Sequence, residues 1–220
     1  MAGVPRHMVD LLDRLHAESW NQESKMTRED FKDRTIDEVM RDKYIALDQD
    51  KAQYVYALCR ATGARTIVEA GTSFGVSTIY LALAAAANAA GGGKPARVIA
   101  TEHEPTKAAT ARENWHQCGK EVADVIDLRE GDLRETLKDE VDDVDLLLLD
   151  IWTPMALPTL QVVQPKIRPG AVVIADNTMG FGAGYKDFLE YMRGPESPFI
   201  SLTLPYKNGL EMSVYVPRRS

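Results

Sequence analysis

The chain has 220 residues, 45% of them hydrophobic, so it can bury one sizeable core and has little left for a second. Its 33 acidic and 26 basic residues give a net charge of -7, which argues against nucleic acid and anionic membrane as partners. We therefore expect one domain over residues 1–220 and a small molecule, neutral or cationic, as its partner.

The N-terminus and the cysteines bear on the compartment. Residues 1–10 lack the apolar core of a secretory signal, and the most apolar stretch, residues 79–93, is mostly alanine and glycine interrupted by Asn88. These features predict a cytoplasmic protein. Cys59 and Cys118 lie in helix-like contexts, so we expect buried thiols rather than a disulfide or a metal pair.

Residues 1–65 carry helical signals. Thr35 to Glu38 fits a capping box, and apolar side chains recur at helical spacing at Ala52, Val55, Tyr56 and Cys59. We expect these helices to cover one face and edge of a Rossmann-like core at residues 66–220. Packing of these helices against the core explains the apolar stripe. The alternative interpretation is that part of the segment covers the active site.

Apolar runs and helical patterns then alternate along the chain. The strand candidates are residues 66–70, 98–101, 125–128, 144–149 and 171–175. This alternation predicts βαβ units and a mostly parallel sheet with helices on both faces. Residues 199–204 and 211–216 are separated only by a turn, so we expect an antiparallel C-terminal hairpin and an α/β fold of seven strands.

The end of the first strand is the most informative segment. Glu69 is followed at once by a Gly71-x-x-x-Gly75 turn and a helix start that contains Ser77. The turn is not the Gly-x-Gly-x-x-Gly that cradles a pyrophosphate, and an acid would repel phosphate. A cationic nucleoside fits better, since ligands of such sheets bind beyond the carboxyl ends of the strands. Glu69, Gly71 and Ser77 are the candidate contacts.

Acids also follow the next two strands. Glu102 ends the second strand, where a carboxylate can accept hydrogen bonds from both ribose hydroxyls of a nucleoside. Its alternative role is an acid at the start of the helix that Pro105 begins, although Glu104 fits that role better. Asp132, after the third strand, is a candidate adenine contact, and also a helix N-cap with Glu135 as its capping partner.

The fourth and fifth strands end in Asp150 and in Asp176-Asn177. If the strands are neighbours, these residues bring hard oxygen ligands to one edge of the sheet and leave positions for water and a substrate with two adjacent oxygens. The pattern predicts a magnesium site, with Mn²⁺ as an equivalent occupant. The alternative is that they are ordinary turn and cap residues.

These motifs together resemble those of class I S-adenosyl-L-methionine (SAM) methyltransferases, and from about residue 67 to residue 216 those of the catechol O-methyltransferase family. The resemblance implies SAM as cofactor and Asp150, Asp176 and Asn177 as metal ligands. It also implies that Trp152 lines the cofactor pocket, that Asp150 serves cofactor and catalysis as well, and that Glu211 holds the second catechol hydroxyl.

One position departs from that family. Where its members have a lysine that acts as the base, this chain has Thr153, which with Pro154 suits an N-cap and first helical position. The metal alone could acidify the hydroxyl, or Lys186 could reach in as the base; a solvated Lys186 at a helix start is the favoured interpretation. The glycine-rich loop 179–185 is either a rim that contributes Phe181 or Tyr185 to an aromatic pocket or a flexible linker.

The sequence thus predicts a SAM-dependent O-methyltransferase that methylates a catechol or another vicinal diol. The alternatives are a metal-independent transferase, a SAM-binding protein without transferase activity and, last, a nicotinamide dehydrogenase, whose fingerprint is absent. The oligomeric state stays open, with a homodimer as one alternative.

Overall fold

The computed structural model describes residues 1–33, 36–41, 43–180 and 182–217. The N-terminal part contains helices α1 (Arg6–Glu23), α2 (Ile36–Met40) and α3 (Gln49–Thr62), with a 3-10 helix at Arg28–Phe31. The next elements are β1 (Thr66–Ala70), α4 (Val76–Ala89), β2 (Arg97–Glu102), α5 (Pro105–Cys118), α6 (Lys120–Ala123) and β3 (Ile126–Glu130). The last are α7 (Leu133–Thr136), β4 (Val144–Leu149), α8 (Thr153–Val163), a 3-10 helix (Gln164–Lys166), β5 (Ile167–Asp176), α9 (Lys186–Arg193), β6 (Phe199–Leu204) and β7 (Leu210–Tyr215).

The seven strands form one sheet in the order β3-β2-β1-β4-β5-β7-β6. The first five strands of that order are parallel, and β7 runs antiparallel to both β5 and β6. The predicted fold, a mostly parallel sheet that ends in an antiparallel hairpin, is therefore confirmed. Because β1 lies between β2 and β4, and β5 next to β4, the residues after these strands meet at one edge.

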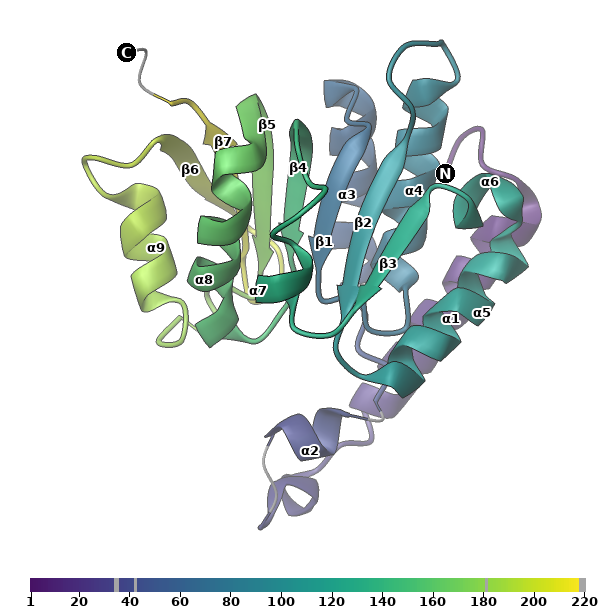
Figure 1. Ribbon diagram of the computed structural model, residues 1–220. Coiled ribbons are helices and arrows are strands. Elements are labelled where there is room, and N and C mark those ends of the chain that lie inside the picture. The colour runs from purple at the N-terminus through teal and green to yellow at the C-terminus, as the bar shows by residue number, and fades with distance from the viewer. Residues whose placement is uncertain (34–35, 42, 181, 218–220) are drawn as a thin grey trace.

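Helices cover both faces of the sheet, as the sequence predicts (Figure 1). One core cluster joins α1, α3, α4 and α5 to one face, and a second joins α8 and α9 to the other. Strand β4 is buried on both faces, and its residues 146–149 have no exposed surface. This double burial explains why β4 is a continuous run of leucines rather than an alternating pattern.

The segment before β1 contains helices α1, α2 and α3, and Thr35 of the predicted capping box lies outside the described residues. The stripe at Val55 and Cys59 packs into the core, and both cysteines are buried free thiols, as expected. Burial raises the pKa of Cys59 to about 12 and that of Cys118 to about 11. In the part of the chain that the structure describes, no helix combines the length and the apolar character that crossing a membrane requires.

Candidate functional site

The loop after β1 packs tightly against its neighbours, which explains its glycines. Gly71 has φ +90°, and a Cβ there would lie 2.1 Å from the carbonyl oxygen of Asp150. Gly75 has φ +81°, and a Cβ there would lie 2.3 Å from Nε1 of Trp115, whose indole donates a hydrogen bond to the Gly75 carbonyl at 3.0 Å. Both positions therefore require glycine, and the loop is held close to the ends of β1 and β4.

Glu69 is fully buried beneath this loop. Its carboxylate accepts hydrogen bonds from the hydroxyls of Thr72 at 2.9 Å and of Ser77 and Thr78 at 2.5 Å each. Burial raises the pKa of Glu69, and the three hydroxyl donors partly oppose that effect. Glu69 and Ser77 thus join β1 to the start of α4, and their direct contact with a cofactor stays a prediction.

Glu102 ends β2 beside the same loop. Its Oε2 accepts the backbone N–H of Ser73 at 2.7 Å, and its Oε1 accepts those of His103 and Glu104 at 2.8 Å each. An ionised carboxylate has about four lone-pair sites, so three N–H donors fix its orientation and still leave acceptor capacity. The carboxylate is only partly exposed, and it is oriented as a preformed acceptor.

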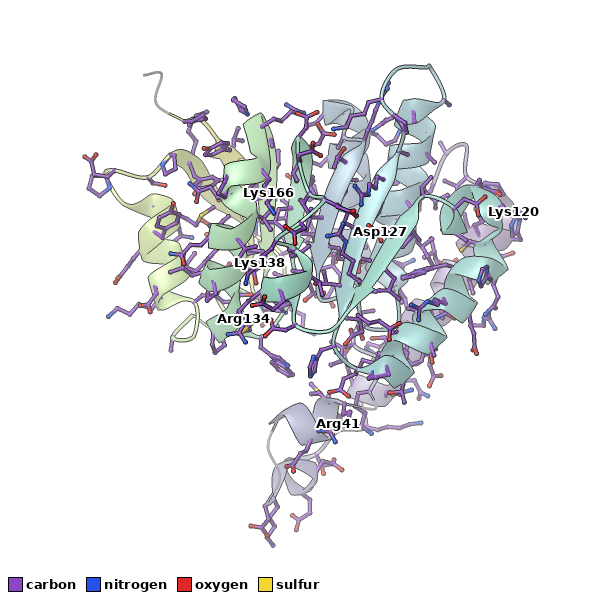
Figure 2. The ribbon with its side chains drawn as sticks, viewed as in Figure 1. Arg41, Lys120, Asp127, Arg134, Lys138 and Lys166 are labelled. Carbon is purple, nitrogen blue, oxygen red and sulfur yellow. The ribbon has the colours of Figure 1, made fainter. Side chains whose placement is uncertain are left out.

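The N-terminal segment packs against this region. The Tyr44 ring stacks on Phe74 of the β1 loop, with centroids 4.0 Å apart and an interplanar angle of 4°. Arg41 lies 3.7 Å from the Glu104 carboxylate, and α2 projects beyond the carboxyl edge of the sheet (Figures 1 and 2). Residues before β1 thus contact the loop that the sequence assigns to the cofactor.

Asp132 is the N-cap of α7, as the structural alternative predicted, and it accepts the backbone N–H of Arg134 at 2.9 Å. The Arg134 guanidinium also pairs with the Asp132 carboxylate, and together these contacts lower the pKa of Asp132 to about 2. Glu135, the expected capping partner, instead pairs with Lys138 at 2.6 Å. Adenine contact by Asp132 stays a prediction.

Asp150 and Asp176 follow the paired ends of β4 and β5, where Leu149 lies opposite Ala175. Burial raises the pKa of both carboxyls, and the charge of Asp176 raises that of Asp150 further. Asn177, at φ +60°, donates its side-chain amide to Asp176 Oδ2 at 2.9 Å. The structure therefore brings the three predicted metal ligands together at one edge of the sheet.

The donors at this edge suit a hard divalent cation. Within the described ranges, no group of three His, Cys, Asp or Glu side chains is arranged to hold a metal ion. The candidate donors at this edge are the Asp150 and Asp176 carboxylates and the Asn177 amide oxygen. Asp176 Oδ1 is buried, and among the described residues it faces the Lys51 ammonium at 2.8 Å. An ionised carboxylate has about two lone-pair sites on each oxygen, so one partner leaves this oxygen capacity for a further ligand. The residues fit Mg²⁺ or Mn²⁺.

Sequence reasoning missed Lys51, which is fully buried in α3. Its Nζ lies 2.8 Å from Asp176 Oδ1 and 3.0 Å from Asp48 Oδ2. Burial alone would lower the pKa of Lys51, but the two aspartates raise it above its ordinary value. The signal was available, because Lys51 is four residues before Val55 and shares the buried face of the helix.

Tyr185 belongs to the core cluster that contains α8 and α9, and it is influenced electrostatically by Asp150 and Asp176, called the acid pair below. It is 1% exposed, and its ring packs edge-on against Phe188. Burial and the charges of Asp150 and Asp176 raise the pKa of its phenol, so it stays protonated at neutral pH. Phe181, the other aromatic candidate for the rim, lies outside the described residues.

The position of the missing lysine is closely packed. Helix α8 begins at Thr153 with Trp152 as N-cap, so the predicted cap was wrong by one residue; the Met155 N–H bonds to the Trp152 carbonyl at 2.8 Å. Thr153 packs against Gly184, where a Cβ would lie 2.1 Å from Thr153 Oγ1. Thr153 is therefore packed against the glycine-rich loop on one side, and its hydroxyl is not a base near neutral pH.

The two remaining candidates, Lys186 and Glu211, have other partners in the structure. The Lys186 side chain is 72% exposed, 3.9 Å from Glu190, in agreement with the favoured interpretation. Glu211 is 1% exposed; the Arg193 guanidinium donates to both of its oxygens at 2.8 and 2.6 Å, and Thr203 donates at 2.7 Å. A catalytic role for either residue stays a prediction.

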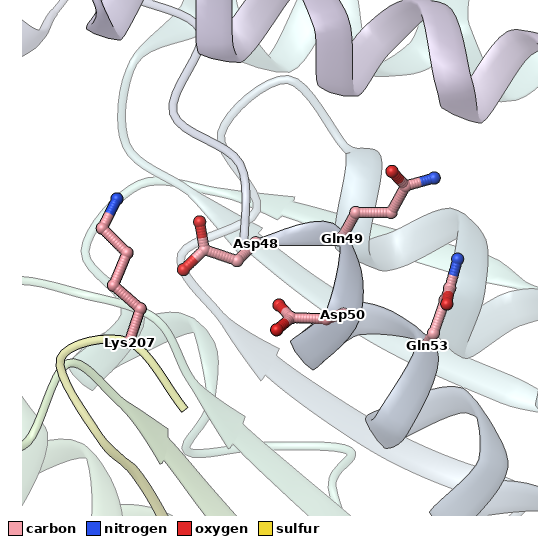
Figure 3. A pocket seen from close by; sticks show the side chains of 5 residues that line it. All are labelled: Asp48, Gln49, Asp50, Gln53 and Lys207. Atoms are coloured by element: carbon pink, nitrogen blue, oxygen red, sulfur yellow. The ribbon is translucent and has the colours of Figure 1, made fainter. Parts of the chain in front are cut away.

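Two large apolar side chains are exposed on the loops of this edge, Trp152 at 46% and Met179 at 70%. A polar cavity of about 420 Å³ opens between the start of α3 and the β6–β7 turn, lined by Asp48, Gln49, Asp50, Gln53 and Lys207. Figure 3 shows the Asp48 carboxylate turned toward the Lys207 side of this cavity. Asp48 therefore connects the cavity to Lys51, and Lys51 to the acid pair.

Comparison with known proteins supports the predicted resemblance. A family described as "Methyltransferase domain" matches residues 68–178. The chain is 31% identical over 139 residues to a catechol O-methyltransferase of Mycobacterium tuberculosis, with 63% of this chain and 59% of that protein covered. It is 29% identical over 178 residues to the catechol O-methyltransferase of Bos taurus, with 76% and 62% covered. The chain thus spans less than two thirds of the length of these curated relatives.

Among solved structures, the O-methyltransferase TomG of Streptomyces achromogenes, determined in complex with SAM, has the same fold. The TM-score is 0.73 at 21% identity, with 98% of this chain and 92% of TomG covered.

Proposed function

Because the chain belongs to the methyltransferase domain family, we propose that it is a SAM-dependent O-methyltransferase that methylates a hydroxyl of a catechol or another small vicinal diol. The observation that carries this proposal is the convergence, at one sheet edge, of the oriented Glu102 carboxylate and the Asp150 and Asp176 pair. The side with Glu102 suits a nucleoside, and the side with Asp150 and Asp176 suits a metal ion that binds two adjacent oxygens of an acceptor.

The nucleoside of SAM would lie across the ends of β1 and β2. Glu102 would accept the ribose hydroxyls with the lone pairs that its three backbone donors leave free. The exposed ring of Trp152 would cover an apolar face of the cofactor, and Asp132 would lie beside the adenine. The surrounding carboxylates favour a sulfonium cation over the phosphates of a dinucleotide.

The acceptor would lie beside Asp150, Asp176 and Asn177, which would hold Mg²⁺ or Mn²⁺. When bound there, the ion supplies positive charge that lowers the pKa of the acceptor hydroxyl. This chain's residues would orient the reactants: Lys51 of α3 pairs with Asp176, and the charges of Asp150 and Asp176 act on the buried Tyr185 phenol. Positioning of the reacting atoms can contribute about 7 to 11 kcal/mol to such a displacement.

A protein base is not part of this proposal. Thr153 has no group that accepts a proton near neutral pH, Tyr185 stays protonated, and the Lys186 side chain is mostly exposed. The metal-independent transferase is the alternative, in which the Lys51 ammonium would be the cationic partner of Asp176. We further propose that residues 1–220 work as one cytoplasmic domain, with a homodimer as one alternative assembly.

A binding titration followed by an activity assay tests the proposal. SAM and NAD would be titrated calorimetrically, each with and without Mg²⁺, and catechols would then be screened for methylation by mass spectrometry. We expect SAM to bind, NAD not to compete, and methylated product to form only with the metal. SAM binding without product would favour a binding protein or another acceptor, and NAD binding would favour a dehydrogenase.

A further inference from the structure

Lys51 has no surface exposure, although lysine is almost never fully buried unless it is paired. Its ammonium lies between Asp48 at the start of α3 and Asp176 at the end of β5. Asp48 is 40% exposed on its side chain, whereas Asp176 is 5% exposed, so the lysine connects the solvent-facing cover to the buried edge of the sheet.

Stability alone does not explain such a contact. Removing two charges from water costs several kcal/mol per ion, and apolar side chains of similar size often serve a core equally well. Lys51 also shares a helix face with apolar residues such as Val55, where a methionine would fit the pattern. The position of its charge relative to Asp176 is therefore its distinctive feature.

The Asp176 carboxylate is held on two sides. Lys51 faces Oδ1 at 2.8 Å, and the Asn177 amide donates to Oδ2 at 2.9 Å. Asn177 is fixed in turn, because its backbone N–H donates to the Gly209 carbonyl at 3.0 Å. These two side-chain donors use one lone-pair site on each carboxylate oxygen, so each oxygen keeps capacity for another ligand.

The charges at this edge are unbalanced. Lys51 pairs with Asp48 and Asp176, and its charge also acts on Asp150, so when these three carboxyls are ionised the ammonium offsets only part of their charge. A divalent cation would balance the remainder, and the lysine would stay beside it without replacing it.

From this geometry we propose that Lys51 is a positioning residue of the cation site, which holds the Asp176 carboxylate in the orientation that binds the metal. The inference rests on the proposed metal-dependent function and assigns to this chain a residue that acts through Asp176. Residues that orient metal ligands typically contribute 10- to 100-fold to metal affinity.

The test is a Mn²⁺ titration of the full chain, followed by electron paramagnetic resonance of free Mn²⁺. Lys51→Met should weaken Mn²⁺ binding by about 10- to 100-fold while SAM affinity stays unchanged. Lys94→Met is the matched control, because Lys94 pairs with Asp143 at 2.7 Å just before β2 and β4, at the opposite edge of the sheet. Turnover in Lys51→Met should recover at saturating Mn²⁺, which a merely structural defect would not do.

Asp48→Asn provides a second variant in case Lys51→Met does not fold. It leaves Lys51 in place but removes one of its two anchors, so Mn²⁺ affinity should fall by a smaller factor. Affinity equal to or higher than that of the wild type in these variants would overturn the inference and identify Lys51 as a competitor of the metal. A wild-type protein that binds SAM but no Mn²⁺ would overturn the metal site itself, and the inference with it.

Discussion

Replacing Glu102 with alanine tests the cofactor side of the site. The carboxylate accepts three backbone N–H groups, from Ser73, His103 and Glu104, so the substitution removes the ribose acceptor and releases the β1 loop from β2. Hydrogen bonds to a charged group contribute about 1.5 to 3 kcal/mol, which corresponds to about 10- to 150-fold in the Kd for SAM. The released N–H groups lie at a partly exposed position, where water can replace the lost acceptor.

The assay is isothermal titration of SAM and of S-adenosylhomocysteine into both proteins at one salt concentration. Both ligands should lose affinity equally, because both carry the ribose. Glu104→Ala is the matched control: the neighbouring acid occupies the N-cap of α5 without a side-chain capping hydrogen bond, and its removal should leave affinity unchanged. Unchanged affinity in Glu102→Ala, or the full loss in Glu104→Ala, would refute the assignment of the ribose acceptor.

Three further predictions follow from the same geometry. Asp176→Ala should abolish turnover as EDTA does, and full activity in either case, with the fold intact by circular dichroism, would favour the metal-independent transferase. Because Thr153 offers no base, the rate of methylation should rise with pH until the bound hydroxyl is ionised. Lys186→Ala should leave that pH profile unchanged, since the Lys186 side chain is mostly exposed. A large loss of turnover in Lys186→Ala would instead identify Lys186 as a relocated base. Burial raises the pKa of Cys59 from 9.0 to about 12, so the stability that its protonated thiol contributes is complete below pH 9 and is lost as the pH rises toward 12. Denaturant titrations should therefore show that the free energy of unfolding falls less between pH 8 and pH 10 in Cys59→Ala than in the wild type. An equal fall in the two proteins would contradict the assigned pKa.

Much of the fold follows from local sequence patterns. The apolar runs that end in Glu69, Glu102 and Asp150 are short and bounded by turns, and they are strands in one sheet. The alternation of these strands with helices predicts a mostly parallel sheet, but their order in the sheet is seen only in the structure. The three predicted metal ligands come together because strands β4 and β5 pair in register.

The partners of individual side chains could not be predicted in this way. Lys51 is 125 positions from Asp176 along the chain, and no local pattern shows that α3 directs a lysine at β5. The sequence predicts that Glu69 contacts the cofactor, but in the structure its oxygens already accept hydrogen bonds from hydroxyls of the following turn and helix. Glu211 meets Arg193 because α9 packs over the hairpin, a tertiary contact that spacing does not encode.

The central claim is that this sheet edge transfers a methyl group from SAM to a metal-bound diol. The most direct measurement incubates the protein with SAM carrying a deuterated methyl group, a simple catechol and Mg²⁺, and follows the label by mass spectrometry. The account predicts labelled monomethyl ether in the wild type and almost none with Asp150→Asn, which keeps the shape of the side chain but removes its charge. A wild-type protein that binds SAM yet transfers no label to any diol, with or without metal, would contradict the account.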